Sequence, residues 1–399
     1  MNQMKSSQTT SAAIAVIVMV ASLSGCTSGL PVVPRNPSPS YDPLLLSGQR
    51  LFGEVVSADE IADVDILAVS DEMAAYVDAS VGDVRIAAAK FRRLFRSLSR
   101  DNYFRASYVA NITHTAQETF DSRSGNCLSY TNMFIALSRQ AGLDARFQIV
   151  KVPPSWDADS GYLIRYTHIN VLMKNVRFDM SRGDDFAVDF NDIHPEPEYI
   201  QYEVSDEYAT ALLYGNKGVA ELRVGNFRRA FAFLKKALQL TPENIDLWIN
   251  LAALYSRQND HPSAIEAYEV ALQIKSSSKG AMSGLARSHQ LLGHIELAEK
   301  YAKRVRRYRE KNPFYHFAIA QAEYDIDQFD RALDSINTAI SLKRSNARFH
   351  FMKGLTLQRL GDKEAAQKSF RRAKRYGRYD DLEKRYGGQL TSSIDPGDY

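Results

Sequence analysis

The second half of the chain repeats one pattern of small and apolar positions every 34 residues. Alanines mark this period at Ala230, Ala264, Ala298, Ala332 and Ala366. Twelve residues before each alanine lies a second small residue, at Gly218, Ala252, Ala286, Ala320 and Gly354. The pattern predicts pairs of helices that touch at the small residues. Because no single pair buries its own apolar stripe, the pairs are expected to stack on one another.

A period of 34 with small residues at two fixed positions resembles the tetratricopeptide repeat. Five such repeats fit the sequence, at about 211–244, 245–278, 279–312, 313–346 and 347–380. Gly225, Gly293 and Gly361 fall where the turn between paired helices is expected. The resemblance implies an all-α superhelix whose groove binds a protein or peptide partner.

One helix of this array is strongly basic. The segment "EKYAKRVRRYREK", residues 299–311, carries its charges on positions that packing does not use. Two interpretations stay open: a solvated helix face, or a rim that favours acidic partners. The net charge of the whole chain is only +3, which argues against a nucleic-acid partner.

The middle of the chain changes from helical to strand periodicity. "SADEIADVDILAVSDEMAAYVD" begins with a capping box from Ser57 to Glu60, and "DVRIAAAKFRRLFRSL" alternates an apolar and an arginine-rich face. The later segments "ARFQIVKV", "YLIRYTHINVLM", "VRFDM" and "DDFAVDF" read as strands. Helices followed by antiparallel strands predict an α+β domain.

Cys127 lies where these two patterns meet. Gly125 and Asn126 break the chain, and a helical period then continues until Gly142. The cysteine is therefore expected in the first turn of an amphipathic helix. Free amide groups at a helix N-terminus favour the negatively charged thiolate, which predicts a reactive sulfur atom.

The other cysteine has a different context. An apolar run from Ala12 to Leu23 is followed by Leu23-Ser24-Gly25-Cys26, which resembles the lipobox of bacterial lipoproteins. The resemblance implies a lipidated Cys26 that anchors the chain to a membrane. Thr27 implies an outer-membrane position that faces the periplasm. Cys127 is then left without a partner for an internal disulfide.

The segments around Cys127 together resemble the transglutaminase-like superfamily. The resemblance is carried by "SGNCLSYTNMFIALSRQAGLDARF", "THINV" and "FAVDFN", within roughly residues 105–195. It implies that Cys127 attacks an amide or acyl carbonyl, that His168 acts as general base and then acid, and that Asp189 orients the imidazole. The backbone amide of Cys127 would be one oxyanion donor.

Several alternatives remain at this site. Asp179 in "RFDMS" competes with Asp189 as third member, and Asn170 could assist instead. Gln117 or Asn111 could supply a second oxyanion donor. The remaining candidate histidines are His114, in an expected helix, and His194, in a Pro-rich loop. The spacing of cysteines and histidines predicts neither a metal site nor a cofactor.

The sequence thus predicts a transglutaminase-like α+β domain followed by an all-α superhelix of repeats. The expected boundaries are 1–25 for a signal peptide, 26–45 for a Pro/Ser-rich tether, 46–203 for the thiol domain, 211–380 for the repeats and 381–399 for a cap and tail. Two functions fit this plan. The first is a lipid-anchored cysteine peptidase or amidase that acts through an acyl-thioester, and the second is a non-catalytic scaffold for envelope assembly.

Overall fold

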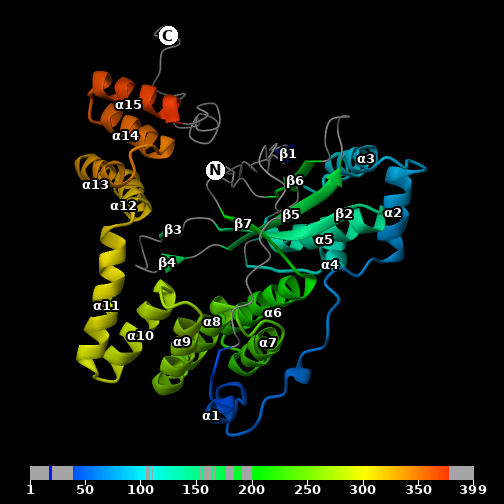
Figure 1. Cartoon of the computed structure of the whole chain (residues 1–399), viewed down its shortest axis with the longest axis horizontal. Coiled ribbons are helices and arrows are strands. Elements are labelled where there is room, and N and C mark those ends of the chain that lie inside the picture. Colours follow the sequence, from blue (N-terminus) through cyan, green and yellow to red (C-terminus); the bar gives the residue numbers. More distant parts are fainter. Residues whose placement is uncertain are drawn as a thin grey trace, which may run out of the picture. The chain divides into compact units, whose positions relative to one another are not determined.

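The computed structural model describes residues 18–19, 39–104, 108–109, 111–151, 155–156, 163–164, 167–176, 184–190 and 200–376. These residues fall into two compact units (Figure 1). Unit 1 takes in residues 1–152 and 167–294, and unit 2 takes in residues 153–166 and 295–399. The division falls inside the third predicted repeat, between its two helices.

Four helices build the front of the thiol domain, and their bounds are α2 (Asp71–Val81), α3 (Ala87–Arg100), α4 (Ala116–Ser122) and α5 (Cys127–Gln140). Phe91, Leu94 and Leu98 on α3 are buried, as the apolar face predicted. The capping box at Ser57 also forms, but it opens only the 3-10 turn η2 (Ala58–Glu60). The long helix expected from Ser57 is therefore shorter and begins at α2, where the Ser70 hydroxyl accepts a hydrogen bond from the Met73 amide.

An antiparallel sheet packs against α5 (Figure 1). Its strands lie in the order β1 (Val18–Met19), β6 (Asp184–Val188), β5 (Thr167–Val176), β2 (Asp144–Lys151) and β7 (Gln201–Val204). The edge strand β1 falls within the segment predicted as a signal peptide, where no strand was expected. A separate pair consists of β3 (Ser155–Trp156) and β4 (Leu163–Ile164). The α+β plan is confirmed, while β7 was not expected, since its short polar run lacks a clear alternation.

The repeats form the expected helix pairs. Unit 1 holds the first five helices, namely α6 (Asp206–Arg223), α7 (Phe227–Leu240), α8 (Ile245–Arg257), α9 (His261–Ile274) and α10 (Lys279–Leu291). Unit 2 holds the next five, namely α11 (Ile295–Glu310), α12 (Pro313–Asp325), α13 (Phe329–Leu342), α14 (Ala347–Arg359) and α15 (Lys363–Tyr376). At Gly354 an added Cβ would lie 2.4 Å from a ring atom of Phe370, which explains the small residue there.

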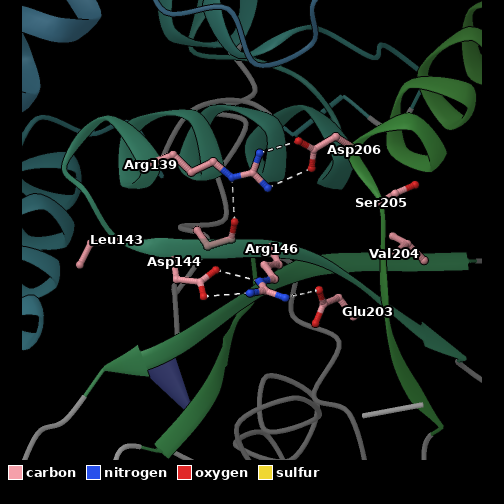
Figure 2. Close-up of a pocket in the computed structure, with 9 residues that line it drawn as sticks. Arg139, Leu143, Asp144, Arg146, Glu203, Val204, Ser205 and Asp206 are labelled. Atoms are coloured by element: carbon pink, nitrogen blue, oxygen red, sulfur yellow. Dashed lines mark hydrogen bonds and ion pairs between the residues drawn. The ribbon is translucent and has the colours of Figure 1, made fainter. Parts of the chain in front are cut away.

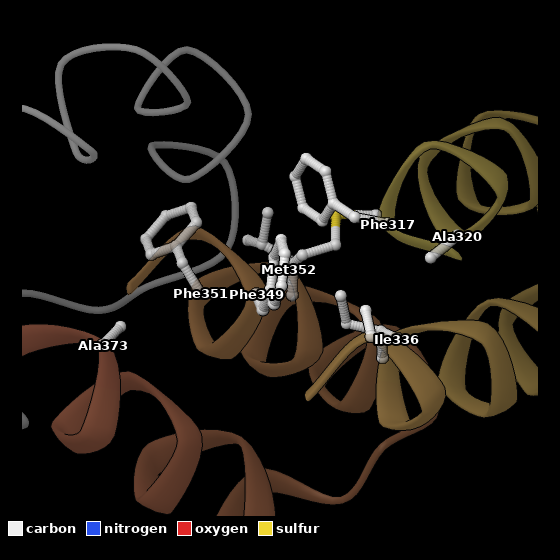
Figure 3. Close-up of a cluster of buried hydrophobic side chains, with 9 residues drawn as sticks. Phe317, Ala320, Ile336, Phe349, Phe351, Met352 and Ala373 are labelled. Atoms are coloured by element: carbon white, nitrogen blue, oxygen red, sulfur yellow. The ribbon is translucent and has the colours of Figure 1, made fainter. Parts of the chain in front are cut away.

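Unit 2 has its own apolar core (Figure 3). Phe317 from α12, Ile336 from α13, and Phe349, Phe351 and Met352 from α14 are all buried in it. Ala373 of α15 also belongs to this cluster and is buried in it. Paired helices of two repeats therefore share one core, which is the stacking that the 34-residue period predicted.

Residues 41–61, named here the N-terminal strap, pack along the repeats of unit 1. Leu45 and Val56 are buried. The Tyr255 hydroxyl donates to the Leu45 carbonyl at 2.7 Å, and Lys235 Nζ donates to the Val56 carbonyl at 2.6 Å. The strap contains η1 (Pro43–Leu46) and α1 (Gln49–Phe52), which lies next to the repeats (Figure 1).

Ion pairs of Arg50 hold the N-terminal strap against α9. The Arg50 guanidinium contacts Asp42 at 2.6 Å and Glu266 of α9 at 2.9 Å, and it also donates to the Ser263 hydroxyl. The sequence had placed residues up to 45 in a tether and residue 46 at the start of the thiol domain. The structure differs because the apolar residues of this segment are buried against α7, α8 and α9.

Within the described part of the chain, no helix has both the length and the apolar character that crossing a bilayer requires.

Candidate active site

Cys127 is the first residue of α5, as predicted. The side chain of Asn126 caps the helix by accepting a hydrogen bond from the Ser129 amide at 3.2 Å. Gly125 has φ +146°, and an added Cβ would lie 2.4 Å from the Ser129 side chain. Glycine is therefore required there, and the tight turn fixes the sulfur atom at the positive end of the helix.

The loop before α4 holds this turn in place. Asn126 Nδ2 donates to Thr113 Oγ1 at 2.7 Å, and the His114 amide donates to Ser129 Oγ at 2.8 Å. The His114 ring contacts the Ser124 carbonyl at 3.1 Å through Nδ1. His114 thus anchors the loop, and Thr113 is a supporting residue that the sequence pattern gave no reason to select.

His168 and Asp189 meet beside the helix. His168 lies on β5 and is buried, and its Nε2 is 2.5 Å from Oδ2 of Asp189, which directly follows β6. The next residue, Phe190, packs against Phe134 of α5 and so fixes the end of the strand. With Nε2 engaged by the carboxylate, Nδ1 is the ring nitrogen left to interact with the Cys127 thiol, which helps to raise the pKa of His168. The structure thus brings together the three residues predicted for catalysis.

The charge state of His168 follows from these contacts. Burial of the ring opposes protonation, but the hydrogen bonds with Asp189 and with Cys127 favour it more strongly and raise the pKa of His168 to about 10. The arrangement therefore favours an imidazolium between a carboxylate and the Cys127 sulfur, which is the form that thiol enzymes use.

Asn170 gives this arrangement further support. It lies two residues after His168 on the same face of β5 and is fully buried. Its Nδ2 donates to Asp189 Oδ2 at 3.4 Å. On the neighbouring strand β2, Gln148 lies directly opposite Asn170 and is also buried. Asn170 thus contacts the third member of the site and does not replace it.

The remaining predicted site residues fall into two groups. Gln117 on α4 and Asn111 in the preceding loop are both exposed. Asp179, His194 and the lipidation candidate Cys26 lie outside the described residues. Among the residues that are described, no three His, Cys, Asp or Glu side chains are grouped so that they could hold a metal ion.

We expect the stability of the folded protein to depend on the protonation of His168. Its pKa is raised above the value near 6.5 of an unfolded chain. The contribution is therefore fully present below pH 6.5 and is lost as the pH rises through about 10. The difference in unfolding free energy between wild type and His168→Ala should shrink by a few kcal/mol from pH 6 to pH 10. Urea denaturation at several pH values measures it.

The half-buried His316 offers a control histidine for this measurement. It lies on α12, and its ring contacts the Glu310 carbonyl at 3.0 Å. The stability of His316→Ala is measured at the same pH values as the comparison for His168→Ala. A wild-type advantage over His168→Ala that stays constant between pH 6 and pH 10 would contradict the imidazolium assignment.

A charged cavity of about 490 Å³ lies at the other end of α5 (Figure 2). Arg139 forms two hydrogen bonds with Asp206 at 2.5 and 2.9 Å, and Arg146 joins Asp144 and Glu203 at 2.8 and 2.7 Å. Hydrogen bonding to Arg146 lowers the pKa of Asp144 despite its partial burial. Carboxylates thus neutralise both guanidinium groups. The cavity lies where the sheet meets the start of α6.

Comparison with known families agrees with this architecture. Residues 73–179 match the family model of the transglutaminase-like superfamily, a range that includes Cys127 and His168. Residues 208–277 and 317–381 match two family models of the tetratricopeptide repeat. The chain therefore contains a transglutaminase-like domain followed by tetratricopeptide repeats, a class of repeat that supports protein or peptide binding.

No curated protein sequence matches the chain. Solved structures that align with it include MamA protein, at 18% identity over 46% of this chain and 96% of MamA, with a TM-score of 0.24. MamA from Desulfovibrio magneticus RS-1 aligns at 16% identity over 43% of this chain and 96% of its own, with a TM-score of 0.25. YrrB, described as a TPR protein with an unusual peptide-binding site, aligns at 19% identity over 46% and 92%, with a TM-score of 0.24. Scores this low support no inference about the present chain.

Proposed function

We propose that this protein is a membrane-anchored envelope lipoprotein whose thiol domain cleaves or transfers an amide bond, and whose repeats hold a protein partner. One observation carries the catalytic part. Cys127 at the start of α5 is among the groups that raise the pKa of His168, and His168 Nε2 lies 2.5 Å from Asp189 Oδ2. A scaffold would not need a buried histidine held between a carboxylate and a thiol.

The geometry supports a reaction in two halves. The Cys127 thiolate attacks the carbonyl carbon of the amide, and the carbonyl oxygen becomes an oxyanion near the free backbone amide of Cys127. When the oxyanion collapses, the C–N bond breaks and the amine leaves with the proton of His168. The acyl group then remains on sulfur as a thioester.

Water completes the cycle. His168, now neutral, takes a proton from the water molecule as its oxygen attacks the thioester. The C–S bond breaks, the carboxylic acid leaves, and the thiolate and imidazolium are restored. Asp189 keeps the imidazole oriented through both halves, with Asn170 donating to the same carboxylate oxygen. An amine in place of water would make the same step an acyl transfer.

The reaction can be tested with N,N-dimethylcasein, whose glutamine side chains offer amides, and a fluorescent primary amine. We expect the wild type to release ammonia by hydrolysis, and Cys127→Ala to lower that rate about a thousandfold. Incorporation of the fluorescent amine would identify acyl transfer instead. Equal rates for wild type and Cys127→Ala would refute catalysis on this probe, and the same comparison with peptide-bond substrates would then decide the proposal.

A scaffold function is the second candidate, and the presence of tetratricopeptide repeats favours it. It predicts that Cys127→Ala restores a strain that lacks the protein, whereas a chain without residues 206–376 does not. The catalytic proposal predicts that neither variant restores that strain. The two outcomes exclude each other, so one complementation experiment separates the candidates.

The membrane anchor rests on the lipobox-like sequence that ends at Cys26. Acyl chains on this residue would hold the protein on the outer membrane, facing the periplasm. We expect Cys26→Ala to move the protein from the membrane fraction to the soluble fraction after cell lysis. Retention of Cys26→Ala in membranes would argue against lipidation as the anchor.

A further inference from the structure

Positive charge is concentrated in the described helices of unit 2. Residues 295–376 contain 19 Lys and Arg against 10 Asp and Glu, a net charge of +9, whereas the whole chain carries +3. The rest of the chain is therefore acidic overall. Charge of one sign gathered on one part of a protein favours partners of the opposite sign.

The last helix, α15, presents this charge most clearly. Lys368, Arg371, Arg372 and Arg375 follow one another at helical spacing and are all exposed. Ala366, Ser369 and Ala373 form the opposite, buried face. The four cations thus form one stripe along the helix, named here the α15 stripe, which points away from the packed core.

Within the part of the chain that the structure describes, no acidic group forms an ion pair with the α15 stripe. Three other cations of unit 2 form ion pairs: Arg306 with Glu299, Arg331 with Glu323, and Arg359 with Asp327. Within the stripe, Lys368 and Arg372, and likewise Arg371 and Arg375, are like charges four residues apart. Such pairs destabilise a helix. The stripe therefore lowers the stability of the repeats, which suggests that it serves an interaction.

The neighbouring helix α14 adds to the positive charge. Burial and then the Arg372 guanidinium lower the pKa of Lys353, whose Nζ donates to Asn337 at 2.6 Å. His350, also on α14, stacks on Tyr376 of α15. Because Arg372 lowers the pKa of Lys353, the two cations lie close enough to repel each other. The positive surface thus extends from α15 onto α14.

We propose that the α15 stripe, together with Lys353, is the docking surface for an acidic segment of a protein partner. Three of the four stripe residues are arginines, whose guanidinium groups bind carboxylates through two parallel hydrogen bonds. The docking surface rests on the proposed function, because it names the chemistry of the partner that the repeats hold.

An anionic membrane surface fits the structure less well. A helix that lies on a membrane inserts an apolar face between the headgroups. The apolar face of α15 is already buried within unit 2, where Phe370 packs against Phe351 and Ala373 closes the core. The outward face of α15 is dominated by the charged stripe, which suits a flexible acidic peptide.

The test measures binding of a fluorescein-labelled poly-glutamate peptide to the full chain by fluorescence anisotropy. We expect Arg371→Glu/Arg375→Glu to weaken binding at least about tenfold at 50 mM salt, and binding by the wild type to fall steeply at 300 mM. The control is Arg85→Glu/Arg96→Glu, which makes the same change in net charge at two exposed arginines of the thiol domain. It should weaken binding by less than about threefold.

Three outcomes would overturn the proposal. Equal loss in both double variants would mean that only net charge matters. Unchanged binding in Arg371→Glu/Arg375→Glu would place the peptide elsewhere. If Arg371→Glu/Arg375→Glu no longer bound phosphatidylglycerol vesicles but still bound poly-glutamate, the stripe would be a lipid-binding surface. Because Cys127→Ala should bind poly-glutamate as the wild type does, failure of the docking surface and failure of the thiol chemistry are distinguishable.

Discussion

Replacing His168 with alanine is expected to slow the alkylation of Cys127 by iodoacetamide at least about tenfold at pH 6.5. The reactive form is the thiolate, and the imidazolium next to it stabilises that form. In the wild type the His168 pKa of about 10 keeps the imidazolium charged throughout the neutral range. Without the ring, the sulfur keeps only the helix N-terminus as a source of positive potential. Mass spectrometry of the peptide that contains Cys127 measures the rate without interference from Cys26.

Two variants sharpen this experiment. Asp189→Asn keeps the shape of the side chain but removes the negative charge that stabilises the imidazolium, so its rate should fall between wild type and His168→Ala. His316→Ala removes a half-buried histidine of unit 2, outside the thiol domain, and should react as the wild type does. If His168→Ala were alkylated as fast as wild type between pH 6 and pH 8, the thiol would be unactivated and the catalytic proposal would fail.

Replacing Leu45 with alanine is expected to lower the unfolding free energy of unit 1 by about 2 to 5 kcal/mol. Leu45 is only 1% exposed, because the N-terminal strap buries it against the repeats. Its neighbour Leu44 is 46% exposed and supplies a matched control of the same residue type. Leu44→Ala should change stability by less than about 0.5 kcal/mol. Urea denaturation followed by circular dichroism measures both.

A second readout ties the loss of stability to the strap itself. Trypsin cleaves after arginine, and Arg50 is held by Asp42 and Glu266 in the folded strap. Leu45→Ala should speed cleavage at Arg50, while Leu44→Ala should not. The pair Val56→Ala and Val55→Ala repeats the comparison, since Val56 is buried and Val55 is 64% exposed. Equal cleavage rates in all four variants would mean that the strap does not depend on these contacts.

Local patterns made much of the site predictable. The start of α5 follows from Asn126 and Ser129, which are three residues apart and cap one another. The helix pairs follow from a period of 34, because each pair packs through small residues twelve apart in sequence. These interactions connect near neighbours along the chain, so the sequence contains the information needed to infer them.

The strap could not be predicted in the same way. Leu45 and Tyr255 are 210 positions apart, and Arg50 and Glu266 are 216 apart. The strap also has no apolar period of its own, since its buried residues are fixed by the surface of α7, α8 and α9. The sequence pattern therefore assigned the first residues of the strap to the tether and the rest to the thiol domain.

The sequence by itself determined the kinds of element, the repeat period, and the position of a cysteine at a helix N-terminus, because capping and periodic packing act over a few residues. Only the tertiary structure decided that Asp189 lies 2.5 Å from His168, since the two residues are 21 positions apart and the chain between them could return to the sheet in several registers. The strap on the first repeats, and the absence of an ion pair for the α15 stripe among the described residues, likewise depend on which distant surfaces meet. Burial and charge pairing are properties of the assembled fold, and no local pattern specifies them.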